Sequence, residues 1–167
     1  GPACWQARNE EASPYSRGEL ARSEDCLTLN VWSPASVGQQ LPVMVWFHGG
    51  GHSSGVGSAT IFDGTAMAKK GVLMVTANYR LGPLGFLAHP ALTAESEHGS
   101  SGNYGILDHV ATLTWVRDNI AAFGGDSDNI TIFGQSAGSW SICALQASPL
   151  ARGLFHRAIG HSGGCFG

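Results

Sequence analysis

The sequence predicts an α/β fold built on a central, mostly parallel β-sheet with flanking helices. Two nearly continuous apolar runs rich in valine, residues 41–47 and 71–79, are typical of strands covered on both faces. A segment with helical spacing of apolar residues, 104–122, follows them, and strands that alternate with helices indicate a parallel sheet. The 167 residues suffice for one domain with a core, and neither a repeat nor a linker divides them. We therefore expect residues 1–167 to belong to a single domain.

Further strands are expected on either side of these segments, in chain order. Residues 26–32 alternate apolar and polar positions, as a half-buried strand does. Residues 129–134 have the pattern of a short buried strand, and residues 157–163 are compatible with another. The polar, glycine-rich segment 93–102 is expected to be an exposed loop.

The most regular helical pattern lies in residues 104–122. Five of its apolar side chains fall on one face at helical spacing: Ile106, Val110, Leu113, Val116 and Ile120. Shorter helices are expected at residues 63–70 and from Ala137 to about Ala147. These helices lie between or directly after the expected strands, which supports the α/β class.

Charge and hydropathy argue against several classes of partner. A net charge of −3 does not favour a nucleic-acid or polybasic membrane partner. No run of about 18 apolar residues occurs, so no membrane span is expected. Residues 1–11 lack the basic and apolar regions of a signal peptide, and a start at Gly1 rather than Met suggests a chain processed or cut from a longer one. The sequence gives no indication of the oligomeric state.

The four cysteines are only partly interpretable. Cys4 and Cys26 flank a polar stretch that is expected to be a surface loop, and a disulfide closing it would stabilise the fold by roughly 3 kcal/mol. Their spacing alone leaves a disulfide and two unpaired thiols equally open. Cys143 lies in an apolar helical pattern and is expected to be a small, unpaired core residue. Cys165 allows no interpretation from the sequence alone.

A serine between two glycines follows the strand expected at residues 129–134. In the stretch FGQSAGSW, Gly134, Ser136 and Gly138 mark a sharp turn from that strand into the next helix. Such a turn strains the backbone of the serine, excludes bulky neighbours and lifts the hydroxyl toward solvent at a helix N-terminus. An ordinary tight turn is the alternative, because so short a pattern recurs by chance. Its position between strand and helix favours a reactive hydroxyl.

Three consecutive glycines follow the strand expected at residues 41–47, in the stretch WFHGGGHSSG. Their peptide N–H groups can point into a cavity with no Cβ in the way. Such a loop can donate to an oxyanion, and each donor contributes roughly 3 kcal/mol to the stability of the transition state. A phosphate-binding loop is excluded, because no Gly-Lys-Ser/Thr follows and the glycine spacing differs. A flexible turn is the remaining alternative, but a serine turn after its own strand downstream favours the oxyanion loop.

The chain resembles the type-B carboxylesterase and cholinesterase-like family of α/β-hydrolases. The matching segments cover nearly all of it: 23–32, 47–51, 78–87, 102–109, 115–126, 130–138 and 150–163. The resemblance implies a partial α/β-hydrolase fold, which lacks the family's N-terminal strands and its C-terminal half.

The resemblance also implies roles for individual residues. Ser136 corresponds to the nucleophile, and the backbone N–H groups of Gly50, Gly51 and Ala137 correspond to the oxyanion hole. The family's first disulfide falls on Cys4 and Cys26, which indicates an oxidising, secreted or periplasmic setting. The family needs neither a metal nor an organic cofactor, so none is expected.

Three positions depart from the family pattern. Gln135 stands where glutamate is most common, and Ser16 stands where cholinesterases carry the tryptophan that holds the choline cation. Position 52, commonly aromatic, is His52, which is equally compatible with a pocket residue and a solvated loop residue. Gln135 and His52 are thus candidate pocket residues, and choline esters are not expected to be the preferred substrates.

The other polar candidates are interpreted as structural. His48 is expected to be a structural hydrogen-bonding residue, and Asp108 either supports the site or is an ordinary helix carboxylate. His89, His98 and His109 lack metal-like spacing, so a zinc site is not expected. His156 and His161 follow the serine, but the resemblance places them in a helix-to-strand segment and not as the catalytic base. The glycosylation sequon at Asn129 has residues that a strand start also favours, so its use stays open.

These observations predict a carboxylic ester hydrolase that acts through a serine acyl-enzyme, on small neutral esters. A catalytically inactive adhesion or interaction domain is the alternative. Such domains typically lose the serine, and this chain keeps Ser136 and the triple glycine. No aspartate or glutamate follows Ser136, and α/β-hydrolases place the acid and then the histidine after the nucleophile. We therefore expect these two residues beyond Gly167, and residues 1–167 alone to be inactive.

Overall fold

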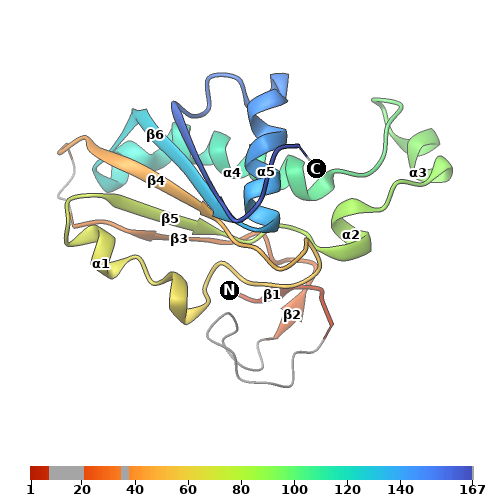
Figure 1. The fold of residues 1–167 in the computed structure, drawn as a ribbon, viewed down its shortest axis with the longest axis horizontal. Coiled ribbons are helices and arrows are strands. Elements are labelled where there is room, and N and C mark those ends of the chain that lie inside the picture. Colours follow the sequence, from red (N-terminus) through yellow and green to blue (C-terminus); the bar gives the residue numbers. More distant parts are fainter. Residues whose placement is uncertain (8–20, 35–37, 167) are drawn as a thin grey trace.

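A computed structural model describes residues 1–7, 21–34 and 38–166, and shows an α/β arrangement (Figure 1). The strands are β1 Ala3–Cys4, β2 Arg22–Ser23, β3 Leu29–Trp32, β4 Leu41–Phe47, β5 Leu73–Ala77, β6 Gly125–Gln135 and β7 Arg157–His161. The helices are α1 Thr65–Ala68, α2 Gly82–Phe86, α3 Pro90–Glu95, α4 Tyr104–Asn119 and α5 Ala137–Ala147. Short 3₁₀ turns span Thr60–Phe62, Ile120–Phe123 and Pro149–Ala151.

The central sheet has the strand order β3-β5-β4-β6-β7. Only β3 is antiparallel to its neighbour, so the expectation of a mostly parallel sheet is confirmed. In the register of β4 with β6, Phe47 lies opposite Gly134. Because these parallel strands end side by side, the loop after β4 and the turn after β6 emerge at the same edge of the sheet.

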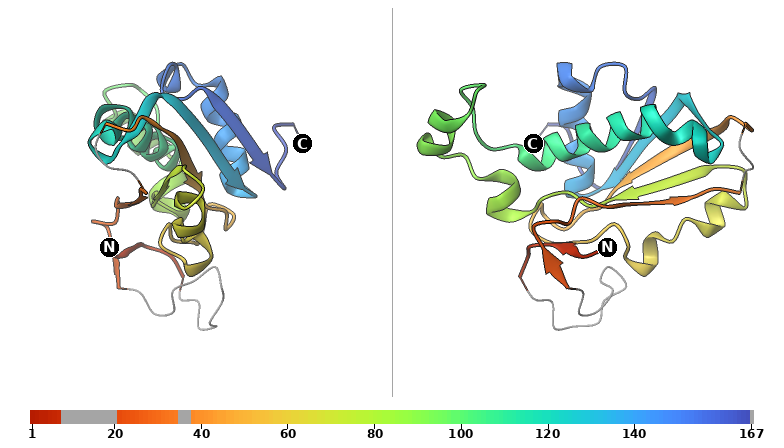
Figure 2. Two further views of the ribbon diagram at one scale, coloured as in Figure 1. Left: turned by 90° about the vertical axis from the view of Figure 1, so that its left-hand side faces the viewer. Right: turned by 180° about the vertical axis from the view of Figure 1, so that it is seen from behind.

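One face of the sheet forms the main core with α4 and α5. Along β4 the alternate residues Val43, Val45 and Phe47 are fully buried in this core. Helix α4 contributes Leu113 and Val116, as its sequence pattern predicts. Figures 1 and 2 show α4 and α5 on the same side of the strands, with α1 on the other side. This packing fixes the direction of α5, and hence the position of its first residues.

Several element boundaries differ from the sequence prediction, among them those of β3, α3 and β6. The strand expected at 26–32 begins only at Leu29, and the N–H groups of Cys26 and Thr28 instead donate to carbonyls two residues earlier, in local turns. Helix α3 extends into the segment expected to be a loop, since Pro90 starts it and the His89 side chain caps it by accepting the Ala91 N–H. Strand β6 starts four residues earlier than expected, at Gly125, which pairs with Leu41.

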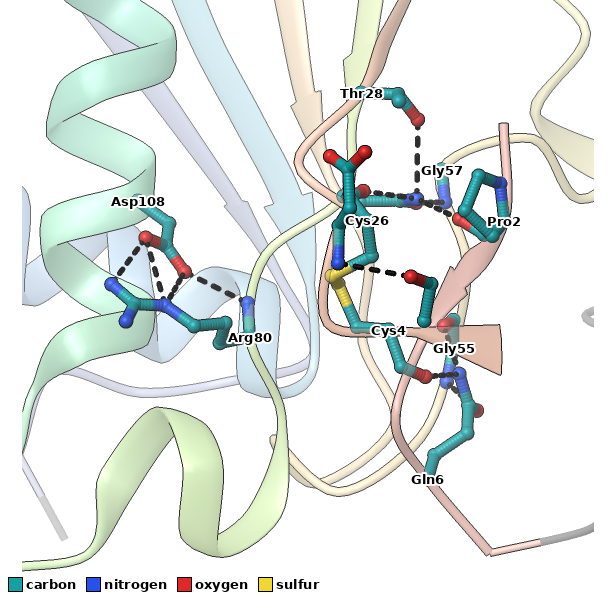
Figure 3. The surroundings of a disulfide bond; sticks show 12 residues. Pro2, Cys4, Gln6, Cys26, Thr28, Gly55, Gly57, Arg80 and Asp108 are labelled. Carbon is teal, nitrogen blue, oxygen red and sulfur yellow. Dashed lines mark hydrogen bonds and ion pairs between the residues drawn. A yellow bond between two sulfur atoms is a disulfide. The ribbon is translucent and has the colours of Figure 1, made fainter. Parts of the chain in front are cut away.

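Asp108 lies on the buried face of α4, although a carboxylate there is unusual. It is 5 % exposed and accepts hydrogen bonds from the Arg80 guanidinium at 2.7–3.2 Å and from the Arg80 backbone N–H at 2.9 Å (Figure 3). The pair joins α4 to the segment after β5. Asp108 is therefore structural, as the sequence suggested, but it is a buried ion-pair residue and not an exposed one.

Two disulfides stabilise the described part of the chain. Cys4 is bonded to Cys26, as the resemblance implied, and Figure 3 shows Gln6 and Gly55 beside this bond. The Gln6 amide donates to the Gly55 carbonyl at 2.9 Å and accepts the Gly55 N–H at 2.8 Å. These two hydrogen bonds thus connect the segment after Cys4 to the end of the glycine loop.

The second disulfide corrects the expectation that Cys143 is unpaired. Cys143 of α5 is bonded to Cys165. Strand β7 lies beside β6, so the chain that leaves β7 returns over α5, where the Ser139 hydroxyl donates to the Gly163 carbonyl at 2.8 Å. The sequence spacing of the two cysteines does not reveal this proximity.

The two disulfides indicate folding in an oxidising compartment. No helix in the described residues is long and apolar enough to cross a bilayer.

Peptide mapping of the unreduced whole protein tests both pairings. We expect one cross-linked peptide pair containing Cys4 and Cys26 and a second containing Cys143 and Cys165, because each pair is already bonded in the fold. Reduction before digestion is the control and should release all four peptides. Alkylation of Cys143 or Cys165 in unreduced protein from an oxidising compartment would contradict the second pairing.

Candidate active site

Ser136 occupies a strained turn between β6 and α5. It is the N-cap residue of α5, with φ 54° and ψ −121°, a region that residues with a side chain rarely adopt. Two backbone hydrogen bonds hold it there: its N–H donates to the His161 carbonyl at 2.9 Å, and its carbonyl accepts the Trp140 N–H at 3.1 Å. Strain of this kind costs on the order of 1–3 kcal/mol and persists where the surrounding structure enforces it.

The two flanking glycines are required by close backbone contacts. A Cβ on Gly138 would lie 2.1 Å from the Phe47 carbonyl oxygen, and one on Gly134 would lie 2.8 Å from the same atom. Any other residue at either position would push α5 away from β4. The Gly-x-Ser-x-Gly spacing is therefore a condition for this strand–turn–helix geometry, as the sequence interpretation proposed.

The loop after β4 is folded tightly around Gly50. Its carbonyl accepts the backbone N–H groups of Ser53 and Ser54 at 3.0 and 3.1 Å, and their hydroxyls at 3.1 and 3.3 Å. Gly50, Gly51 and His52 all have positive φ, at 108°, 62° and 57°. A Cβ on Gly50 would lie 2.0 Å from the Ser54 carbonyl oxygen. These contacts describe a defined conformation that only glycine allows at position 50.

The loop and the serine turn line one cavity of about 280 Å³. The predicted residues Gly50, Gly51, Gln135 and Ser136 all contribute to its wall. The others are His48, Gly49, Ser54, Gly55 and Phe62. Ala137 does not line it, but begins α5, and the N–H groups in the first turn of a helix have no partner within that helix. Two segments more than 80 residues apart thus meet around one space, beside the side chain of Ser136.

His48 is a buried residue of the cavity wall and is neutral at physiological pH. It is 1 % exposed, and this burial lowers its pKa to about 4. Its Nδ1 lies 2.8 Å from the Gly49 carbonyl oxygen, and the Tyr79 hydroxyl donates to the His48 carbonyl at 2.8 Å. Its ring also stacks on Tyr79. These contacts support the loop, in agreement with the structural role expected from the sequence.

His52 does not line the cavity. Its ring stacks on Phe86 with centroids 4.5 Å apart, and its Nε2 lies 2.9 Å from Oγ of Ser141, a fully buried residue of α5. Sequence reasoning missed Ser141, and it also missed His109, which is buried on α4 with its Nε2 3.2 Å from the same oxygen. A signal for His109 was present, since it precedes Leu113 by four residues on the apolar face of α4.

The described residues that line the cavity include one imidazole, that of His48, and no carboxylate.

The family model described as "Carboxylesterase family" matches residues 1–167. The chain belongs to this family.

Similar proteins support the assignment to the carboxylesterase family. The chain is 54% identical over 165 residues to the para-nitrobenzyl esterase of Bacillus subtilis (strain 168), covering 98% of the chain and 32% of that protein. It is 55% identical over 157 residues to the fumonisin B1 esterase of Sphingopyxis macrogoltabida, covering 93% and 29%. A solved carboxylesterase of Geobacillus stearothermophilus superposes with a TM-score of 0.84 at 49% identity, covering 96% of this chain and 31% of that one. The chain thus spans less than a third of these relatives.

Proposed function

We propose that the whole protein is a carboxylic ester hydrolase and that residues 1–167 form part of its α/β-hydrolase catalytic domain. One observation carries the proposal: the strained Ser136 and the residues of the glycine loop line the same cavity. A nucleophile beside fixed N–H donors is the arrangement that acyl transfer requires. The esterase names of the similar proteins agree with it.

In the proposed reaction, Ser136 Oγ attacks the acyl carbon of the ester. The π electrons of the carbonyl move to its oxygen, which accepts hydrogen bonds from the N–H groups of Gly50, Gly51 and Ala137. The Oγ proton passes to a base and then to the departing alcohol, which leaves an acyl-serine. Water attacks this ester in turn, releases the acid and restores the hydroxyl.

The base and its acid partner are proposed to come from another part of the whole protein. The cavity contains no histidine–carboxylate pair among its described lining residues, and its one imidazole, His48, is buried and bonded to Gly49. In the α/β-hydrolase order both partners follow the nucleophile. The binding surface for the rest of the ester is accordingly expected to be shared between parts of the whole protein.

Labelling of the whole protein with a fluorophosphonate probe tests the function directly. The reactive serine displaces fluoride from phosphorus, so the wild-type protein should acquire a covalent label on the peptide that contains Ser136. The Ser136→Ala variant is the matched control and should remain unlabelled. An unlabelled wild-type protein without esterase turnover would favour the adhesion or interaction domain.

The proposed substrates are small neutral esters, and a comparison of esters of one acid tests this. Gln135 is a neutral amide in the cavity wall, so it offers no charge attraction to a quaternary ammonium group. Ser16, at the position of the cholinesterase tryptophan, lies outside the described residues. Because cation–π contact would also be lost there, we expect kcat/KM for a neutral alkyl or aryl ester to exceed that for the choline ester by about tenfold. A preference for the choline ester would contradict this specificity.

The two disulfides further support a secreted or periplasmic location for the whole protein. Fractionation of the producing cells, with antibody detection of the protein in each fraction, tests this location.

A further inference from the structure

Ser141 is a buried junction between three elements that surround the candidate site. Its hydroxyl lies on α5, one helical turn after Ala137, and its residue is 0 % exposed. The Nε2 atoms of His52, from the glycine loop, and His109, from α4, lie 2.9 and 3.2 Å from this oxygen. One hydroxyl thus connects the loop after β4, the helix that starts at the serine turn, and the helix packed beside it.

Contacts of both its backbone and its ring hold His52 in place. Its φ of 57° is unfavourable for a residue with a Cβ, at a cost on the order of 1 kcal/mol. Its carbonyl accepts the Gly82 N–H at 2.7 Å, and its ring stacks on Phe86 of α2. The ring also meets Trp140 of α5 edge-on, with centroids 6.2 Å apart. These contacts keep the ring pointed away from the cavity and toward Ser141.

The hydrogen bonds at Ser141 can be satisfied together. A serine hydroxyl donates one proton and accepts at two lone pairs, and each neutral imidazole carries one N–H. Burial lowers the pKa of both His52 and His109, so both rings are neutral near pH 7. The hydroxyl can accept from one ring while it donates to the other, and neither contact repels.

We propose that His52 is a positioning residue of the oxyanion loop and that its bond to Ser141 holds Gly50 and Gly51 in register with the first turn of α5. The inference rests on the proposed function and adds a residue pair to it. Two amide donors come from the loop and one from α5, so the oxyanion hole is divided between two elements. The His52–Ser141 bond is a side-chain contact that joins those two elements directly, outside the cavity wall.

Loss of the His52–Ser141 bond should affect the kinetics differently from a change in a residue that lines the substrate pocket. Loss of one oxyanion donor lowers kcat by about 10²–10³, and a displacement of 1 Å can cost about 10². The ground-state ester contacts these donors less strongly than the transition state does, so a displaced loop should change kcat far more than KM. A residue that lines the substrate pocket would change KM instead.

Steady-state kinetics of the whole protein with an activated neutral ester tests the inference. We expect Ser141→Ala and His52→Phe each to lower kcat by about 10–100-fold, with KM within about threefold of wild type. The double variant should be no slower than the slower single variant, because both changes break the same His52–Ser141 bond. His52→Gln, which keeps a donor, should restore part of kcat. Affinity for a trifluoromethyl ketone, whose adduct places an oxyanion in the hole, should fall in parallel with kcat.

Thr76→Val is the matched control. Thr76 is a fully buried hydroxyl residue of β5 that accepts the Asn30 side-chain amide at 3.0 Å, toward the edge of the sheet. This variant should lose stability comparable to Ser141→Ala, measured by thermal unfolding, while kcat stays within about twofold of wild type. Ser141→Ala removes one oxygen and adds no atoms, so it decides the question even where His52→Phe does not fold.

Three outcomes would overturn the inference: an unchanged kcat in Ser141→Ala, a rise of KM alone in His52→Phe, or losses in the double variant that multiply. In each of these three outcomes the wild-type protein is active, so the outcome contradicts the role of His52 but not the proposed function. Failure of the proposed function would appear differently, as a wild-type protein without turnover or a Ser136→Ala variant that retains it.

Discussion

Replacement of Ser136 by alanine in the whole protein is expected to lower kcat for an activated ester by about 10⁴-fold or more. The change removes the single oxygen that forms the acyl bond in the proposed reaction. The cavity and the loop amides remain, so weak residual acceleration and an ordinary KM are expected. The free energy of unfolding should change by less than about 1 kcal/mol, because the hydroxyl lies in a partly exposed turn and its backbone contacts are kept.

Ser148→Ala is the control for the first prediction. The Ser148 hydroxyl oxygen accepts the Leu150 N–H at the start of a 3₁₀ turn beyond α5. Its replacement by alanine should therefore leave kcat unchanged. Turnover by Ser136→Ala within tenfold of wild type, with the label of the fluorophosphonate probe on another serine, would remove Ser136 from the mechanism.

Replacement of Gly138 by alanine is expected to destabilise the whole protein by about 3 kcal/mol or more. The added Cβ would lie 2.1 Å from the Phe47 carbonyl oxygen and 3.0 Å from that of His48, and both atoms belong to the backbone. Neither can move without breaking the pairing of β4 with β6 or displacing α5. Because the same displacement would separate Ser136 from the glycine loop, esterase activity should be lost with the fold. Chemical denaturation followed by circular dichroism measures the change in stability.

Gly71→Ala is a glycine control for backbone strain without a close contact. Unlike Gly138, Gly71 has a positive φ, 82°, and no atom lies within 4 Å of the position that its Cβ would take. This variant should cost only the backbone strain, about 1 kcal/mol. A stability loss in Gly138→Ala no larger than that in Gly71→Ala would show that the contact with the Phe47 carbonyl does not set the cost at position 138.

The candidate site shows which features local sequence rules can predict. The turn at Gly134, Ser136 and Gly138 was predictable, because a sharp strand-to-helix turn restricts residue size within five positions. The environment of His52 was not predictable in the same way. Its neighbours Phe86 and Ser141 come from α2 and α5, and the choice between pocket and interior depends on how these helices pack.

The disulfides likewise differ in how far the sequence could predict them. The pairing of Cys4 with Cys26 followed from a family resemblance, whereas spacing alone left it open. The bond between Cys143 and Cys165 went unrecognised, because a cysteine on an apolar helix has the same pattern whether it is paired or free. Asp108 is a third case, since its burial depends on Arg80, 28 residues earlier in the chain.

The sequence by itself determined the α/β class, the two apolar central strands, the long helix and the glycine–serine turn. Each of these follows from side-chain periodicity or backbone restriction within a few residues, and such rules act before distant parts of the chain meet. Only the tertiary structure decided that the glycine loop and Ser136 share a cavity, that His52 points to Ser141, and that Cys143 bonds to Cys165. These contacts join residues far apart in the chain, so they depend on the strand order β3-β5-β4-β6-β7 and on the helices packed against it.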